Sequence, residues 1–445
     1  MDTDKVMNRW LVVVGAILIQ LCLGAIYAWS VFTKKLELPE TDGGYGFSTA
    51  QTQWIFSAGL ATFALVMLFA GRWQARVGPK RVAMVGGIVL GVGYILGGVL
   101  GKTFWPQMIC IGIIGGAGIG LAYVVPIAVG VKWFPDKKGM ITGLAVAGFG
   151  FGATIWVKLA GSWIWDGGLL GKAHGMFGLH GVQAVFIIYG IAFLVLVLLG
   201  SVVMVNPPSG WKPAGWNPEA PAAGGAIPSG VLDVAARQMA GTPQYWGLLL
   251  MFTGSAMAGL MVIGCIRLFG IDSLIANNVV SGESAIEEAG KMAGTAMAFL
   301  AILNGLGRII WGTVSDKIGR KPALLLMCLI QGLMMLMFFK VGGTKIGLIV
   351  GACVIGFNFG GNFALFPAAT ADFFGNKNVG TNYPWVFLAY GIAGVVGPQI
   401  AAYFRDHAAG DVNAWTTPFI IAGIACLAAA VLGLLLKAPR QTQSA

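Results

Sequence analysis

Long apolar stretches alternate with short polar segments along most of the chain. A helix needs about 20 apolar residues to cross the hydrocarbon core of a bilayer. The pattern predicts twelve membrane-spanning helices, near residues 10–32, 51–70, 82–100, 106–131, 140–160, 182–205, 243–266, 291–312, 322–340, 346–370, 383–403 and 414–436. Because lipid cannot satisfy backbone polar groups, the expected fold class is an all-α membrane protein.

One polar segment interrupts this rhythm at the middle of the chain. It is rich in proline and glycine, as linkers are, and contains Pro207, Pro208, Pro213, Pro218, Pro221 and Pro228. We therefore expect an N-terminal six-helix bundle over residues 1–205, a cytoplasmic linker over 206–242 and a C-terminal six-helix bundle over 243–445.

The two predicted bundles repeat one another. One offset of 241 residues links three pairs of positions: Gly71 with Gly312, Gly120 with Gly361, and Pro126 with Pro367. A constant offset at three features indicates tandem duplication of a six-helix unit. Transporters built from parallel repeats bind substrate near mid-membrane, between the repeats.

Composition excludes several classes of protein. The chain is 57% hydrophobic and 10% charged, with a mean hydropathy of +0.81, whereas soluble domains carry about 25% charged residues. The net charge of +11 comes from short loops rather than from a basic stripe, so we expect no nucleic-acid partner. The six cysteines lie in apolar spans at spacings that suggest neither a metal site nor a disulfide framework. No cofactor is expected.

Lysine and arginine gather in the loops of one side, including Arg72, Arg76, Lys80, Arg81, Lys132, Lys317, Arg320 and Lys321. The other side carries fewer: Lys34, Lys35, Lys102, Lys172 and Arg405. Cytoplasmic loops are enriched in these residues, so both termini should face the cytoplasm. The expected location is a bacterial inner membrane, where the chain acts as a monomer within the lipid bilayer.

Two of the basic loops share a motif that follows the second and eighth spans. The first copy contains Gly71, Arg76 and Gly78, and the second contains Gly312, Asp316, Gly319 and Arg320. Both resemble the loop signature of the major facilitator superfamily, in which a turn at glycine and a charge lock between helices control conformational change. The first copy has Ala75 at the acidic position, so the resemblance places the lock at the second copy.

A further motif opens the fifth span, where Trp133-Phe134-Pro135-Asp136-Lys137-Lys138 leads into Gly143-Leu144-Ala145-Val146-Ala147-Gly148. This stretch resembles monocarboxylate transporters and the oxalate/formate antiporter family. The first-span stretch from Gly24 to Phe32 is similar to the latter family. The resemblance implies a proton-coupled transporter of small monocarboxylates, such as L-lactate or pyruvate, working by alternating access. The alternative that it implies is an anion exchanger of the oxalate/formate kind.

Arg308 is the sharpest chemical signal, because it interrupts the apolar eighth span. A guanidinium in hydrocarbon is costly, stays charged and can bind a carboxylate with two parallel hydrogen bonds. No acidic residue lies in an apolar core to neutralise it, so an anionic substrate is the expected partner. Asn304 lies on the same helix face. The related monocarboxylate transporters carry an Asp–Arg pair at this spacing, and Asn304 replaces the Asp. The alternatives are an Arg308 that extends to the cytoplasmic interface and an Asn304 that only packs helices.

Other polar residues within the spans are weaker candidates for substrate binding. Tyr123 and Tyr390 could each donate to a carboxylate, with ordinary packing as the alternative. The expected substrate-binding set also includes Tyr27, Asn358 and Asn362. We expect core packing for Phe359 and Phe387. The eleventh span has no basic residue, although the related oxalate transporters use a second cation there. One cation within the membrane favours one carboxylate.

Two cations near the predicted outer ends of spans have no clear role. Lys158 lies toward the end of the fifth span, and Arg267 ends the seventh. Both are expected to extend outward to the interface, with attraction of anions to an outer vestibule as the alternative.

The sequence shows no dedicated proton carrier. The three histidines lie in predicted outer loops, and no acidic residue lies at a span centre, although Asp372 is at the inner end of the tenth. The family resemblance favours proton symport, and the residues leave exchange open. No nucleophile–base pair, metal cluster, phosphate loop or signalling domain is visible, so the chain is not expected to be an enzyme or a sensor.

Overall fold

The computed structural model describes residues 7–42, 44–134, 138–161, 168–172, 176–179, 181–208, 211–213, 234–375, 379–407 and 411–436. All regular structure in these residues is helical, and twelve helical segments are long and apolar enough to cross a membrane. This confirms the predicted fold class. Most of the predicted linker, including residues 214–233, lies outside the described part, as do His174, His180 and Lys377.

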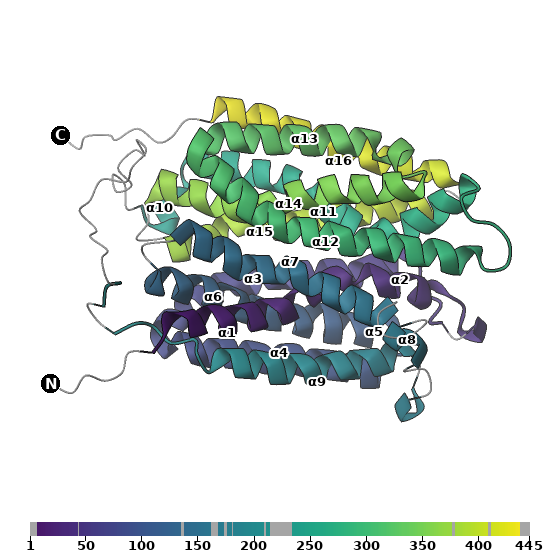
Figure 1. Ribbon diagram of the computed structural model, residues 1–445, viewed down its shortest axis with the longest axis horizontal. Coiled ribbons are helices and arrows are strands. Elements are labelled where there is room, and N and C mark those ends of the chain that lie inside the picture. The colour runs from purple at the N-terminus through teal and green to yellow at the C-terminus, as the bar shows by residue number, and fades with distance from the viewer. Residues whose placement is uncertain are drawn as a thin grey trace.

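The helices form two groups that lie side by side in Figure 1, which we call the N-half and the C-half. The N-half contains α1 (Arg9–Leu23), η1 (Gly24–Ala28), α2 (Ser30–Glu37), α3 (Thr49–Val77), α4 (Pro79–Leu100), α5 (Phe104–Gln107), η3 (Met108–Gly115), α6 (Gly116–Trp133), α7 (Lys138–Gly161), α8 (Gly168–Lys172) and α9 (Gly181–Ser201). The short α10 (Ala236–Ala240) precedes the C-half, which contains α11 (Pro243–Ala276), α12 (Ala285–Ile318), α13 (Arg320–Val341), α14 (Lys345–Phe374), α15 (Val379–Asp406) and α16 (Thr416–Leu435).

The molecule has two ends along its long axis. At the termini end, α1 begins at Arg9 and α16 finishes at Leu435. At the far end, α2 finishes at Glu37 and α15 at Asp406 (Figure 1). These names are used below without reference to a side of the membrane.

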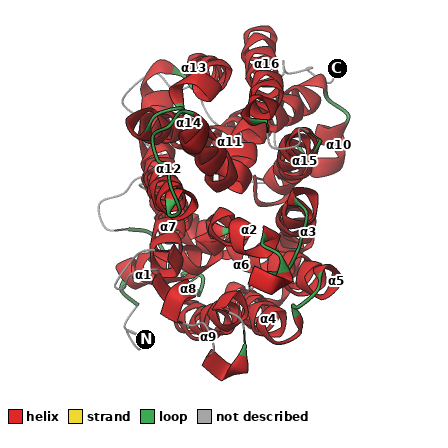
Figure 2. Ribbon diagram, turned by 90° about the vertical axis from the view of Figure 1, so that its right-hand side faces the viewer, coloured by secondary structure: helices red, strands yellow, loops and turns green. Residues whose placement is uncertain are grey.

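The halves meet mainly along α7 with α12, α3 with α15, and α2 with α11 (Figure 2), and less extensively where α14 meets α7 and where α11 meets η1. Small residues bring the first two pairs together. Thr154 of α7 donates to the Ala298 carbonyl of α12 at 3.1 Å, and Ser57 of α3 donates to the Gly394 carbonyl of α15 at 2.7 Å. Small and hydroxyl residues at such interfaces allow close backbone approach where no hydrophobic effect drives association.

Several helices extend beyond their apolar cores, which corrects the predicted boundaries. The helix α11 continues to Ala276 and α12 runs from Ala285 to Ile318, whereas the apolar pattern predicts 243–266 and 291–312. Charged residues end the hydropathy pattern, but the helical backbone continues past them. Arg267 therefore does not end its span, contrary to the expectation.

The same extension corrects the predicted loop motifs. Gly71 lies inside α3 and Gly312 inside α12, so neither begins a loop. The turns fall at the repeat-related Gly78 and Gly319, whose φ angles of +89° and +92° suit glycine. The duplicated sequence motif thus has matching backbone geometry in the two halves.

Candidate functional site

Arg308 lies within α12, and none of its side chain is exposed. The helix continues to Ile318, so about 15 Å of helix separates Arg308 from the termini end. A guanidinium that extended to the interface would be exposed at its head. The burial of Arg308 argues against that alternative.

The hydrogen bonds of Arg308 leave one nitrogen unused. Its Nε donates to Oδ1 of Asn304 at 3.2 Å, and its Nη1 donates to the backbone carbonyl of Val146 at 2.9 Å. Val146 belongs to α7, so the second bond crosses from the C-half to the N-half. Nη2 of Arg308 and Nδ2 of Asn304 have no partner among the described residues. Two buried donors therefore lack a hydrogen-bond partner in the described part of the chain.

Aromatic rings enclose the guanidinium. Its central carbon lies 4.0 Å from the ring centroid of Phe363 and 5.5 Å from that of Phe149. Both distances are within the range of cation–π attraction. Phe363 comes from α14 and Phe149 from α7, so each half contributes a ring.

The three predicted tyrosines meet at the same place. The hydroxyl of Tyr390 on α15 donates to that of Tyr27 on η1 at 2.9 Å. The hydroxyls of Tyr27 and of Tyr123 on α6 lie close enough to the guanidinium of Arg308 to interact with it. All three tyrosines are at most 2% exposed. The structure therefore gathers Arg308, Asn304 and these tyrosines from both halves, in a closed arrangement that we call the central site.

A local break in the first span positions Tyr27. The α-helical turns of α1 give way to the 3-10 helix η1 at Gly24. A Cβ at Gly24 would lie 1.9 Å from the backbone oxygen of Phe149, so only glycine permits this approach of η1 to α7. The break brings Tyr27 to 4.9 Å from Phe149, centroid to centroid, in an edge-on contact.

Asn358 and Asn362 are buried in α14, but no hydrogen bond or ring contact joins them to the central site among the described residues. Oδ1 of Asn362 accepts a hydrogen bond from Ser255 of α11 at 2.8 Å, within the C-half. Nδ2 of Asn358 donates to the carbonyl of Val354 one turn earlier. Their neighbours Phe359 and Phe363 face Tyr27 and Arg308 instead.

Sequence reasoning missed the aromatic lining of the central site. Rings from α3, α7, α14 and α15 pack around the three tyrosines, namely Phe63, Phe149, Phe359, Phe363 and Phe387. Phe359 and Phe387 are buried, as expected of core residues, but the core that they join is the lining of the site. With 26 phenylalanines in the chain, no local signal separates these from the rest.

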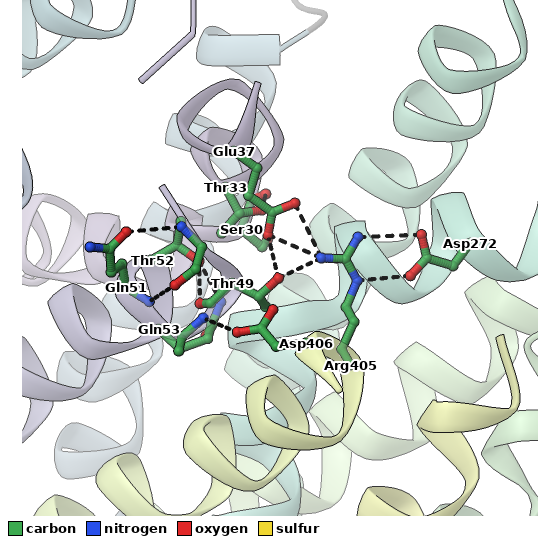
Figure 3. Close-up of polar contacts among 12 residues, drawn as sticks. Ser30, Thr33, Glu37, Thr49, Gln51, Thr52, Gln53, Asp272, Arg405 and Asp406 are labelled. Carbon is green, nitrogen blue, oxygen red and sulfur yellow. Dashed lines mark hydrogen bonds and ion pairs between the residues drawn. The ribbon is translucent and has the colours of Figure 1, made fainter. Parts of the chain in front are cut away.

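A second cluster, missed by the sequence, joins the halves at the far end (Figure 3). Arg405 of α15 donates from Nε to Asp272 of α11 at 2.9 Å. Its Nη1 donates to both oxygens of Glu37 on α2 at 3.2 Å, and to Oγ1 of Thr49 on α3 at 2.6 Å. Trp415 donates to Asp272 as well, at 3.0 Å. We call Glu37, Thr49, Asp272 and Arg405 the far-end latch. The apolar pattern predicts that the eleventh span ends at residue 403, so it assigns Arg405 to a loop, whereas α15 continues to Asp406.

The termini end carries the second copy of the loop motif. Arg320 pairs with Asp316 at 2.7 Å and with Asp372 of α14 at 3.0 Å, and it also contacts Ser315. These residues all belong to the C-half, at the predicted position of a charge lock. In the first copy, Arg76 is exposed, and a Cβ at Gly71 would lie 3.1 Å from the carbonyl oxygen of Gly380 on α15.

The groups of the central site are of the kinds that recognise an anion. Its cation is desolvated, its unused groups are hydrogen-bond donors, and its walls are aromatic. Among the described residues, no group of three or more His, Cys, Asp or Glu could bind a metal ion. The described chemistry is that of recognition, with a buried guanidinium as its centre.

Comparison with known proteins places the chain in a family. The family model described as Major Facilitator Superfamily matches residues 9–398 and 285–445. The uncharacterized MFS-type transporter YhjX of Escherichia coli is 30% identical, over 87% of this chain and 86% of its own. The oxalate:formate antiporter of Oxalobacter formigenes is 26% identical over 95% and 90%, and monocarboxylate transporter 12 of Rattus norvegicus is 23% identical over 95% and 84%.

The fold has solved counterparts. A bacterial homolog of the human lysosomal transporter Spinster, in an inward-facing and unoccupied conformation, has a TM-score of 0.65 at 16% identity, covering 96% of each chain. The resemblance drawn from the sequence motifs, to monocarboxylate transporters and to the oxalate/formate antiporter, is confirmed by these relatives. The chain is a multi-pass membrane protein that belongs to the Major Facilitator Superfamily.

Proposed function

We propose that this chain is a secondary transporter of small monocarboxylates, of the L-lactate and pyruvate class, which moves its substrate with a proton by alternating access. One observation carries the proposal: Arg308 is fully buried between the halves, has no carboxylate partner among the described residues and keeps Nη2 free. An unpaired buried charge is unfavourable, and a substrate carboxylate would compensate it with charge-assisted hydrogen bonds. Relatives named for monocarboxylate and for oxalate and formate transport support this class of substrate.

The single buried cation favours one carboxylate over two. At the centre of α15, the side chain that faces the site is Tyr390, which is bonded to Tyr27 rather than offering a second positive charge. A monocarboxylate would pair with Arg308 and leave its apolar end against Phe149 and Phe363. A dicarboxylate would bring a second negative charge into an aromatic environment, at a large desolvation cost.

The halves would alternate around this site. In the proposed orientation, with both termini in the cytoplasm of a bacterium, the far end faces outward and the far-end latch closes the outer path. Opening that end would break the contacts of Arg405 with Glu37 and Thr49 but keep its contact with Asp272, because Arg405 and Asp272 belong to the same half. The Asp316–Arg320–Asp372 cluster and the glycine turns at Gly78 and Gly319 would control the opposite end.

The second candidate function is an anion exchanger of the oxalate/formate kind. Asn304 favours it, because an amide stands where a titratable carboxylate would pair with Arg308 and could release a proton. An exchanger needs no such group, since the second anion replaces the first at the guanidinium.

Uptake of labelled L-lactate into proteoliposomes tests both functions. An inward proton gradient should drive uptake by the wild type, and Arg308→Ala should abolish it, whereas the exposed Arg237→Ala serves as a matched control and should transport normally. Uptake that ignores the gradient but requires internal oxalate or formate would make the chain an exchanger. Uptake that Arg308→Ala leaves intact would refute the central site.

A further inference from the structure

Arg267 of α11 is, with Arg308, one of two described arginines that have a buried nitrogen without a hydrogen-bond partner. It is partly buried, the unpartnered nitrogen is its Nε, and no described carboxylate pairs with it. Its guanidinium lies against α12, where a Cβ at Gly290 would approach Nη2 to 2.9 Å and one at Gly294 would approach Nη1 to 4.0 Å. Glycine at position 290 lets the guanidinium lie close to the α12 backbone, and no described carboxylate neutralises its charge.

A second cation reaches the same stretch of α12 from the other half. Nζ of Lys158 on α7 donates to Oγ1 of Thr295 at 3.2 Å. No described carboxylate pairs with Lys158 either. Thr295 follows Gly294 directly, so α12 meets Arg267 from the C-half and Lys158 from the N-half within less than two turns.

Two other arginines show that partly buried arginines in this protein can have carboxylate partners. Arg405 at the far end pairs with Glu37 and Asp272, and Arg320 at the termini end pairs with two aspartates. Arg267, like Arg308, has no such partner. Buried polar groups in proteins are normally satisfied, and an unsatisfied one calls for an explanation.

Arg267 lies between the far-end latch and Arg308 along the long axis of the molecule. Arg267 precedes Asp272 on α11 by five residues, so it lies about 7 Å deeper than the far-end latch. Its neighbour Gly294 precedes Arg308 on α12 by 14 residues, or about 21 Å. A solute entering from the far end would pass the latch, then Arg267 and Lys158, and then reach Arg308.

We propose that Arg267 and Lys158 form an outer anion-binding site, which takes the substrate carboxylate before it moves to Arg308. The proposal rests on the proposed function for the identity of the substrate and for the orientation of the far end. Two cations that no described carboxylate pairs with raise the local concentration of a small anion and its rate of arrival. The buried Nε of Arg267 has no partner among the described residues and is available to a carboxylate.

Kinetics in proteoliposomes of phosphatidylcholine alone test this site. Arg267→Gln should raise the KM for L-lactate entering from the far end by about tenfold, with the maximal rate changed by less than about twofold, because the site acts on capture. Arg267→Lys keeps the charge and should restore most of the affinity. Lys345→Gln and Lys102→Gln remove exposed far-end charges and should leave KM near the wild-type value.

The possible results separate the explanations. An unchanged KM in Arg267→Gln, or an equal rise in Lys345→Gln, would overturn the outer site, the latter because only the general surface potential would then matter. An effect of Arg267→Gln that appears only when anionic lipid is added would assign the guanidinium to a lipid headgroup and would also overturn it. Size-exclusion profiles of the variants establish that each is folded.

A binding measurement can disprove the outer site independently of the proposed transport function. Saturation-transfer NMR on purified Arg308→Ala should still show contact with L-lactate, and Arg308→Ala combined with Arg267→Gln should show none. Loss of the signal in Arg308→Ala alone would confine binding to the central site. A wild type that binds lactate but does not transport it overturns the proposed function, while this measurement, which needs no transport, still decides the outer site. A wild type that neither binds nor transports lactate overturns both.

Discussion

At the scale of single residues, the central question is how the protein keeps Arg308 charged inside a membrane bundle. Its positive charge is met by two rings, an amide oxygen and one backbone carbonyl, none of which carries a full negative charge. These partners orient the guanidinium and leave its attraction for an anion largely uncancelled. The ring of Phe363 is the nearest of the two and fixes the plane against which a substrate would bind.

Replacement of Phe363 by leucine should therefore weaken substrate binding. Loss of a desolvated cation–π contact costs about 0.5–2 kcal/mol, which predicts a rise in KM of about two- to thirtyfold. Phe366→Leu is the matched control, because Phe366 is equally buried on α14 but stacks on Phe252, 4.4 Å away, and does not touch Arg308. Lactate uptake kinetics measure both variants, and equal KM values would show that the ring acts only through packing.

The sequence identifies the polar members of the central site because a charge or a phenol is rare in an apolar span. Arg308, Asn304, Tyr27, Tyr123 and Tyr390 stand out for this reason, and the structure brings them together. Phenylalanines do not stand out, because each is as compatible with lipid as with a binding site. Asn358 and Asn362 show that a polar residue in an apolar span need not belong to the site. The amide of Asn362, for example, accepts a hydrogen bond from Ser255 within the C-half instead.

At the scale of helices, the junction of η1 with α7 holds the site together. The backbone of Gly24 touches that of Phe149, and a Cβ on Gly152 of α7 would lie 2.1 Å from the carbonyl oxygen of Leu21. The two glycines allow a contact between backbones that larger residues would prevent. Tyr27 and Phe149, which both line the central site, take their positions from this contact.

Gly24→Ala should separate η1 from α7. Overpacking a close contact typically costs about 1–3 kcal/mol, so the variant should unfold at a lower temperature and transport more slowly. Gly161→Ala, at the end of α7, is the control, because its Cβ would meet Val31 at an ordinary 3.5 Å. Thermal unfolding of both variants in detergent checks this prediction, which fails if Gly24→Ala is as stable as the control.

The apolar pattern locates all twelve spans, because lipid imposes one length and one composition on each. It does not locate their ends. Helices such as α11 and α12 continue past the apolar core, where charged side chains are solvated but the backbone stays helical. Asp272 and Arg405 lie in these extensions, so the pattern could not show that they meet Glu37.

At the scale of the whole molecule, the two halves are held by contacts of different kinds. Along α7–α12 and α3–α15 the contacts involve small residues and single hydrogen bonds, which allow one helix to move along another. At the far end the contacts are ionic and converge on Arg405. The structure holds this network in its paired arrangement, and the alternating access proposed above requires it to separate.

Arg405→Gln should shift the protein toward a state open at the far end. The variant removes both ion pairs and leaves Glu37 and Asp272 to repel each other across the interface. For a partly buried network the change is about 1–2 kcal/mol, which predicts about a five- to thirtyfold larger open population. Cys265 on α11 reports it, because this thiol is fully buried about two turns below Asp272 and is within range of the charges on Arg405 and Glu37.

The measurement is the rate at which a charged methanethiosulfonate modifies Cys265 in nanodiscs, where the reagent reaches both ends of the protein. Arg405→Gln should accelerate the reaction in proportion to the open population, and Cys265→Ser in the same background should abolish the added signal. Lys345→Gln, which removes an exposed far-end charge, should have no effect. If Arg405→Gln still transports but leaves Cys265 as protected as in the wild type, packing rather than the latch closes the far end. The contacts along α7–α12 and α3–α15 would then have to supply the whole of the closing free energy.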